Sequence, residues 1–215
     1  MNILDAHYIV TTLGMVGILT ILFVETGLLI GLVFPGDSLL FIAGVAASAT
    51  AMETFGIQLP ISILLLAAPL FAILGSQLGH LLGATYGRKL FSRPDSRIFS
   101  QAKVQRTEKW LSKYGLGKAL ILARFIPVVR TLINPLCGIV GIPAAKFAIW
   151  NLISGIIWTD GIILAGFTLG EKLSGSVDKY LLPIVGVIII LSLIPVAIQF
   201  IKEWQTRKHL TCKPL

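Results

Sequence analysis

The chain has 215 residues, of which 55% are hydrophobic and only 13% are charged. Soluble domains carry about 25% charged residues, so about half of the usual polar surface is missing. The composition excludes a soluble globule and predicts an all-α polytopic membrane protein. A formal net charge of +8 would suggest a nucleic-acid partner only on a soluble fold with a basic face, so we expect no nucleic-acid binding. Two cysteines without a Cys/His cluster predict no disulfide framework, no metal site and no cofactor.

The basic residues are distributed unevenly. All 18 Lys and Arg residues follow residue 87, and nine of them lie between Arg88 and Lys118. Four more lie from Lys202 onward, which gives a basic tail over 203–215. Because Lys and Arg are retained on the cytoplasmic side, both basic segments are predicted to be cytoplasmic. The N-terminus has no basic region before its first apolar run, which argues against a cleaved signal peptide.

Six apolar or amphipathic segments follow one another before the tail. A first apolar region with internal polar breaks is followed by a membrane helix, a surface amphipathic helix, a second broken apolar region and two more membrane helices. In that order their ranges are 9–51, 59–87, 92–115, 116–142, 147–170 and 180–202.

The charge rule then fixes a topology. If 88–118 is cytoplasmic, 59–87 runs inward and 147–170 runs outward, so 116–142 must leave the cytoplasm and return to it. That segment is predicted to be a re-entrant hairpin with its tip near Arg130 to Pro135. The first region is predicted to be a second re-entrant hairpin entering from the opposite face, which would place the N-terminus outside; a full span would place it inside. Two broken segments in corresponding positions are typical of an inverted-repeat transporter.

Four ionisable residues interrupt the two broken segments: Glu25, Asp37, Arg124 and Arg130. Buried charges cost several kcal/mol unless paired, so a structural interpretation is two internal ion pairs. The functional interpretation is a site where the arginines bind an anionic lipid headgroup and the carboxylates exchange protons or gate access. The two interpretations are compatible, because a pair that closes an empty site can open for substrate.

Neighbouring residues support these four. Pro127 interrupts the helix between the two arginines, and Pro35-Gly36 predicts a turn that frees Asp37 from the helix carrying Glu25. Pro135 and Asn151 complete the set of supporting residues. Asn151 is expected either to bond to a hairpin tip or simply to hold helices together.

Other residues receive structural interpretations. Glycines recur every fourth position from Gly75 to Gly87, which predicts close helix packing within a protomer or in a homo-oligomer equally well. His80 is expected to be a satisfied core histidine. Asp160 is either a third proton carrier or a hydrogen-bonded helix residue. Serine- and aspartyl-protease motifs and the Walker phosphate loop do not occur, so we expect no enzyme.

Taken in order, the motifs resemble the DedA family, which is also described as the SNARE-associated or VTT domain. The resemblance covers about residues 10 to 205 and is closer to the bacterial branch than to the eukaryotic scramblases. The residues that carry it are Glu25, Phe34-Pro35-Gly36-Asp37-Ser38, Gly75 to Gly87 with Tyr86, Arg124-Phe125-Ile126-Pro127-Val128-Val129-Arg130, Pro135, Gly138, Phe147, Asn151, Gly155 and Trp158.

The resemblance implies a bacterial inner-membrane protein with two oppositely oriented re-entrant hairpins. It further implies lipid translocation, either recycling of undecaprenyl phosphate or flipping of phosphatidylethanolamine, and it places the family's important charges at Glu25, Asp37, Arg124 and Arg130. Our prediction is a transporter of a phosphate-bearing lipid, first of all undecaprenyl phosphate, coupled to protons. The alternatives are another phospholipid flippase or scramblase, a proton- or cation-coupled antiporter of a small solute, and an assembly factor without transport.

Overall fold

A computed structural model describes residues 6–28, 36–91 and 101–172, and every regular element in these ranges is a helix. The predicted all-helical class is therefore confirmed for the described part of the chain. The predicted segments at 180–202 and 203–215, and residues 92–100, lie outside it. The helices are α1 (Ala6–Gly27), α2 (Gly36–Val45), α3 (Ala51–Phe55), α4 (Ile61–Phe91), α5 (Gln101–Arg124), α6 (Pro127–Ile139) and α7 (Ala144–Lys172).

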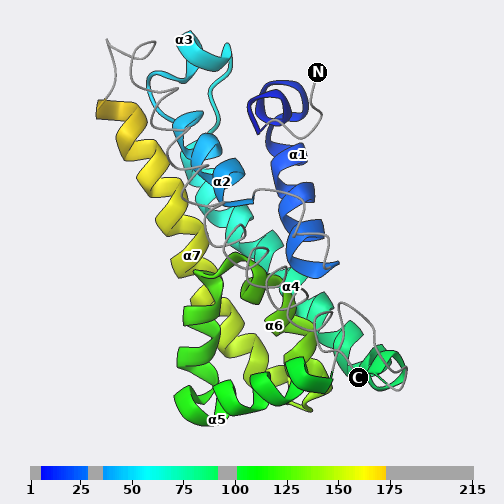
Figure 1. The fold of residues 1–215 in the computed structure, drawn as a ribbon. Helices are drawn as coiled ribbons and strands as arrows, with labels where there is room; N and C mark the ends of the chain where they lie inside the picture. The colour runs from blue at the N-terminus through cyan, green and yellow to red at the C-terminus, as the bar shows by residue number, and fades with distance from the viewer. Residues whose placement is uncertain (1–5, 29–35, 92–100, 173–215) are drawn as a thin grey trace, which may run out of the picture.

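Two long helices form the frame of the molecule. α4 and α7 pack against each other and run its whole length in opposite directions (Figure 1). Residues Ile61–Gly87 and Ala144–Lys172 are each long and apolar enough to cross a membrane. Large apolar side chains stay exposed along both helices, including Leu66, Leu70 and Ile157. Such a surface is suited to lipid, which replaces water as the solvent of a membrane helix.

Shorter helices occupy the two halves of this frame. α1 and α2 lie in the upper half of Figure 1, and the second part of α5 lies with α6 in the lower half. α1 packs on α4 and α2 packs on α7, while α6 packs on α4 and α5 packs on α6 and α7. The two pairs of short helices therefore approach the middle of the molecule from opposite ends.

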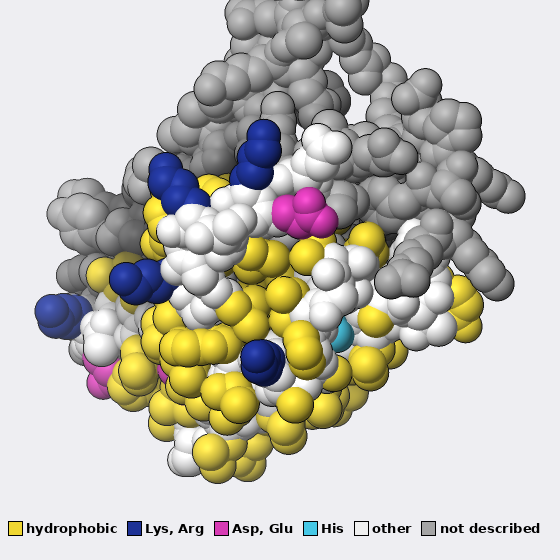
Figure 2. Space-filling view, turned by 90° about the horizontal axis from the view of Figure 1, so that it is seen from below, with side chains coloured by type: hydrophobic (Ala, Val, Ile, Leu, Met, Phe, Trp, Pro, Cys, Tyr) yellow, Lys and Arg dark blue, Asp and Glu magenta, His cyan; other side chains and the backbone are white. Residues whose placement is uncertain are grey.

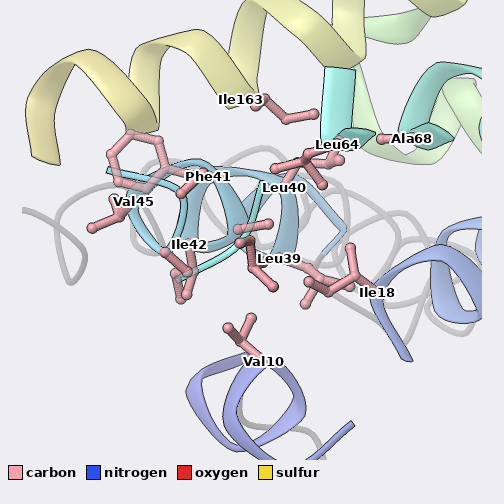
Figure 3. Packing of buried hydrophobic residues seen from close by; sticks show 14 of the residues in the cluster. Val10, Ile18, Leu39, Leu40, Phe41, Ile42, Val45, Leu64, Ala68 and Ile163 are labelled. Atoms are coloured by element: carbon pink, nitrogen blue, oxygen red, sulfur yellow. The ribbon is translucent and has the colours of Figure 1, made fainter. Parts of the chain in front are cut away.

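α2 is the most enclosed of the short helices. Its residues from Ser38 to Val45 are buried, as expected for a helix that is apolar on every face. Figure 3 shows Leu39 and Leu40 of α2 among Ile18 of α1, Leu64 of α4 and Ile163 of α7. A second, smaller apolar cluster around Phe147 joins α5, α6 and the start of α7.

Glycine breaks divide two of the helices. Gly14 in α1 (φ 55°) and Gly115 in α5 (φ 73°) take backbone conformations that glycine adopts at least cost. At Gly115 the amphipathic first part of α5 ends, and its second part turns toward the middle of the molecule (Figure 1). The predicted boundary between 92–115 and 116–142 thus coincides with a real change of direction.

The break inside 116–142 falls at Pro127, as expected, whereas the expected hairpin tip at Arg130 to Pro135 is helical. The helix ends at Arg124 and restarts at Pro127, and Ile126 between them is extended (φ −116°, ψ 105°). A residue before proline disfavours the helical conformation, and proline itself fits the first position of a helix, so Pro127 sets the break. Pro135, expected near the tip, lies inside α6, where the lost backbone hydrogen bond does not end the helix.

The glycine stripe of α4 serves packing within one protomer. A Cβ at Gly75 would meet Thr26 and Phe23 of α1, and one at Gly83 would meet the backbone of Pro135 in α6. The same helix face thus lets both short-helix pairs approach α4 closely. The sequence left intramolecular and intermolecular packing open, and the structure gives the stripe an intramolecular role.

Basic side chains gather at the end of the molecule where α5 lies. Lys109, Lys113, Lys118 and Lys146 are exposed there, and Figure 2, which views this end, shows dark blue side chains beside apolar ones. The described cations of the segment 88–118 therefore lie together at one end of the molecule.

Candidate functional site

Charged side chains meet in the middle of the molecule, at the ends of the short helices. Glu25 lies in the last turn of α1, Asp37 in the first turn of α2, Arg124 at the end of α5 and Arg130 in the first turn of α6. The fold brings together residues that lie up to 105 positions apart in the sequence. Glu25, Arg124 and Arg130 are at most 5% exposed, so this is a buried ionic cluster. All four predicted charges belong to it.

Arg130 forms ion pairs with both carboxylates. Its Nη2 donates to Glu25 Oε1 at 2.7 Å, and its Nη1 donates to Asp37 Oδ1 at 2.5 Å. The Asp37 side chain is 23% exposed, whereas that of Glu25 is fully buried. Two ion pairs on one guanidinium form a closed triad, because each nitrogen at the end of the fork holds an acid.

Trp158 of α7 contacts the triad and both arginines. The indole Nε1 donates to Asp37 Oδ1 at 3.0 Å, and the Arg130 guanidinium carbon lies 4.6 Å from the centroid of the indole ring. The Arg124 guanidinium lies 5.5 Å from the same ring. The positive charge of each arginine is therefore attracted to one aromatic side chain.

Arg124 has a different environment. Its Nη2 donates to Asn151 Oδ1 at 2.5 Å and to Ser76 Oγ at 3.2 Å. Asn151 in turn donates from Nδ2 to the Ile73 carbonyl of α4 at 3.0 Å. Asn151 thus joins α7 to α4 and turns its oxygen toward Arg124. Its bond to α4 is the helix-joining role that was the second expectation for Asn151, and Arg124 lies outside Arg130 to Pro135, where the hairpin tip was predicted.

The other supporting residues are placed as follows. Gly36 lies against the Glu25 carboxylate, which a Cβ at that position would strike. Pro127 begins α6, and the Pro135 backbone packs on Gly83. Pro35 falls outside the described residues. None of these placements assigns a role by itself; together they let α1, α2 and α6 come close enough for the triad.

Three contributors were not anticipated from the sequence. Ser76 carries no motif, and its only signal is a hydroxyl inside a long apolar run, one residue after a glycine of the stripe. Trp158 was named only among the residues that carry the family resemblance, without a role. Asn134 donates to the Thr26 carbonyl at 3.1 Å, which ties α6 to the end of α1 beside the triad.

Two further titratable residues stay outside the cluster. His80 is bonded through Nε2 to the Ile142 carbonyl at 3.0 Å and stacks on Phe147. It therefore fixes the turn after α6, a structural role. Asp160 accepts a hydrogen bond from Thr159, and no contact among the described residues links it to the four charges.

Comparisons with known proteins place the chain in a family. Residues 9–168 match the VTT domain family. The chain is similar to Protein DedA of Escherichia coli K12, with 37% identity over 183 residues that cover 85% of this chain and 80% of the relative. It is similar to an uncharacterised membrane protein of Mycobacterium tuberculosis CDC 1551, with 34% identity over 194 residues, 90% of this chain and 81% of the relative.

A third relative is the inner membrane protein YqjA of Escherichia coli K12, with 35% identity over 154 residues, 70% of this chain and 65% of the relative. No solved structure matches the chain. Two of these relatives are named as membrane proteins, and the exposed apolar surfaces of α4 and α7 suit the same location.

Proposed function

Because the chain belongs to the DedA family of VTT-domain membrane proteins, we propose that it moves a phosphate-bearing lipid across the bacterial inner membrane and is not an enzyme. The headgroup passes through the ionic cluster, while the hydrocarbon chain of the lipid stays in the bilayer. Undecaprenyl phosphate is the substrate that we place first, and phosphatidylethanolamine is the alternative lipid. The partners are then this lipid and protons.

The observation that carries the proposal is the position of two arginines among helix ends in the apolar interior. Arg124 and Arg130 are almost fully buried, and a guanidinium binds phosphate oxygens through a planar fork. Ionisable groups at membrane depth mark substrate or ion pathways more often than structural pairs. The surrounding apolar face of α4 and α7 would let a lipid tail follow its headgroup.

The proposal includes the topology. The pair α1 and α2, and the pair formed by the second part of α5 with α6, are the two re-entrant hairpins, entering from opposite faces of the membrane. Their approach from opposite ends supports this, as does the basic end formed by α5. Irregular backbone at the breaks is tolerated at membrane depth because protein surrounds it. The segment 88–118 and the C-terminus are cytoplasmic in this arrangement.

Charge counting supports proton coupling. Glu25, Asp37, Arg124 and Arg130 sum to zero, so the empty cluster is neutral. A phosphate monoester brings between one and two negative charges near neutral pH. Adding them to a buried neutral cluster is unfavourable unless protons arrive as well. Protonation of Glu25 or Asp37 would restore neutrality and release Arg130 for the phosphate.

The test is headgroup translocation in proteoliposomes. Undecaprenyl phosphate and phosphatidylethanolamine are compared with and without a pH gradient, for the wild type and for Arg130→Ala. We expect selective, gradient-dependent movement of the polyprenyl phosphate, lost in the variant. Lys146→Ala is the matched control, because it removes an exposed cation at the basic end and should transport normally. If neither lipid moves under any gradient, lipid translocation is wrong.

One observation favours a second candidate, an assembly factor without a transport cycle. The triad is closed, as a purely structural ion pair would be. Arg130→Lys separates the two functions. A structural triad keeps a positive charge between its two acids and retains function, whereas a phosphate site loses the bidentate fork of the guanidinium.

A further inference from the structure

The two arginines of the cluster are not equivalent. Arg130 has an acid on each terminal nitrogen. Arg124 is bonded to the neutral side chains of Ser76 and Asn151, and no carboxylate among the described residues lies within ion-pair distance of it. Its Nη1 is buried and has no hydrogen-bond partner in the described part of the chain. The Nε of Arg130 is also buried without a partner there, so the two arginines differ in their counter-ions: Arg130 has two acids and Arg124 has none.

A buried cation that lacks a counter-ion and has an unpartnered donor, as Arg124 does, indicates a missing anionic ligand. An unsatisfied buried hydrogen-bonding group is costly, and a buried cation without an acid is costlier still. Neutral oxygens of Ser76 and Asn151 orient the guanidinium but leave its charge uncompensated. The Asn151 amide cannot turn away without losing its bond to the Ile73 carbonyl. The surroundings therefore hold Arg124 in place without neutralising it.

Trp158 connects the two arginines. Its ring lies beside both guanidiniums, and its Nε1 bonds to Asp37, an acid of the triad. A ligand that binds at Arg124 would consequently lie close to the triad without having to displace an acid from Arg130. Entry at Arg130 would require breaking at least one buried ion pair first.

We propose that Arg124, positioned by Ser76 and Asn151, is the subsite where a phosphate monoester first binds, and that the Glu25–Asp37–Arg130 triad is a latch that withholds Arg130 until a later step. This division rests on the proposed function, which it deepens by assigning different roles to the two arginines. The ligand is defined by its chemistry, a phosphate with two or more free oxygens. It can come from a lipid monophosphate or from free phosphate.

Binding and translocation are then separable properties. Arg124→Gln removes the subsite and keeps the latch, whereas Arg130→Gln keeps the subsite and removes the latch. The probes are farnesyl phosphate, a lipid monophosphate with a short chain, and inorganic phosphate. Binding of each to the purified full-length chain in detergent micelles is followed by isothermal titration calorimetry and by the phosphorus NMR signal.

We expect Arg124→Gln to weaken farnesyl phosphate binding about tenfold or more, the effect of losing one strong charge-assisted contact. Arg130→Gln should weaken binding less than Arg124→Gln does, because it adds net negative charge to the cluster but leaves the contact at Arg124 in place. The reverse order, or equal losses in both variants, overturns the division of roles. Binding of inorganic phosphate as tightly as farnesyl phosphate supports the subsite and assigns it to free phosphate. Binding of neither probe to the wild type overturns it.

A second pair of variants controls for loss of binding through misfolding. Asn151→Asp supplies Arg124 with a carboxylate at the position of its present acceptor, so it should weaken binding as Arg124→Gln does. Ser154→Ala is the matched control on the same helix: Ser154 is buried and bonds only to the Asn151 backbone carbonyl among the described residues. It should bind as the wild type does. Thermal unfolding of each variant identifies any that does not fold, and unchanged binding in a folded Asn151→Asp contradicts the proposal.

The same experiments test the Arg124 subsite separately from lipid translocation. Binding that depends on Arg124, in a protein that translocates no lipid, supports the subsite and refutes translocation. Translocation that is indifferent to Asn151→Asp supports the transporter and refutes the subsite.

Discussion

Replacing Glu25 by Gln tests whether the latch also stabilises the fold. The substitution keeps the size of the side chain and removes one carboxylate from Arg130, while Asp37 remains. Removing one partner of a buried ion pair costs about 3–5 kcal/mol. Because a second acid still holds Arg130, we expect the lower end, about 3 kcal/mol. Asp37→Asn should cost less, about 1–2 kcal/mol, since its side chain is partly exposed and Asn Oδ1 still accepts hydrogen bonds.

The measurement is the free energy of unfolding in mixed detergent and dodecyl sulfate micelles, followed by helical circular dichroism. Glu53→Gln provides the matched control, because Glu53 is exposed in α3. It should stay within about 0.5 kcal/mol of the wild type. The reasoning is refuted if Glu25→Gln unfolds at the wild-type free energy, or if Asp37→Asn costs more than Glu25→Gln.

Two more predictions follow from the packing and from the guanidinium geometry. Gly83→Ala should destabilise the fold by about 1–3 kcal/mol, because the new Cβ meets the Pro135 backbone. Gly161→Ala should stabilise it by about 0.5–1 kcal/mol, because nothing lies within 4 Å of a Cβ there and alanine favours the helix. Equal unfolding free energies for the two variants would contradict this packing. In proteoliposomes, Arg124→Lys and Arg130→Lys should each slow lipid translocation, because lysine lacks the bidentate fork. Normal transport by both lysine variants would exclude bidentate phosphate binding.

Much of the frame could be predicted from the sequence. The apolar runs at 59–87 and 147–170 correspond to α4 and α7, because twenty or more apolar residues in succession have few alternatives to a buried or lipid-facing helix. The break after Arg124 follows from Pro127, as predicted, but Pro135, predicted near the hairpin tip, lies inside α6. Proline before a helix starts it, whereas Pro135 within a surrounded helix did not end it.

The pairing inside the cluster could not be predicted. Arg124 and Arg130 lie in the same short motif, and nothing local distinguishes them. The distinction comes from Asp37 and Glu25, 93 and 105 residues away, which bond to Arg130 and not to Arg124. Ser76 was missed for the same reason: a single serine in an apolar helix acquires its meaning only when α5 is placed beside it.

The division of the cluster between helices bears on how it works. All four charges come from the ends of short helices: Glu25, Asp37, Arg124 and Arg130 lie within one turn of a break or of a helix end. The neutral groups that hold them, Ser76, Asn151 and Trp158, come instead from the middle of the two long helices. These three residues belong to the frame formed by α4 and α7, and they contact the charges without neutralising them.

A purely structural ion pair gains nothing from this division, because two charges on rigid helices would hold each other better. Residues at helix breaks can turn through small backbone changes while the frame stays in place. The arrangement therefore favours a cluster whose charged members exchange partners against a fixed neutral background. Such an exchange is what a headgroup needs if it is to replace the acids at Arg130 and then leave again.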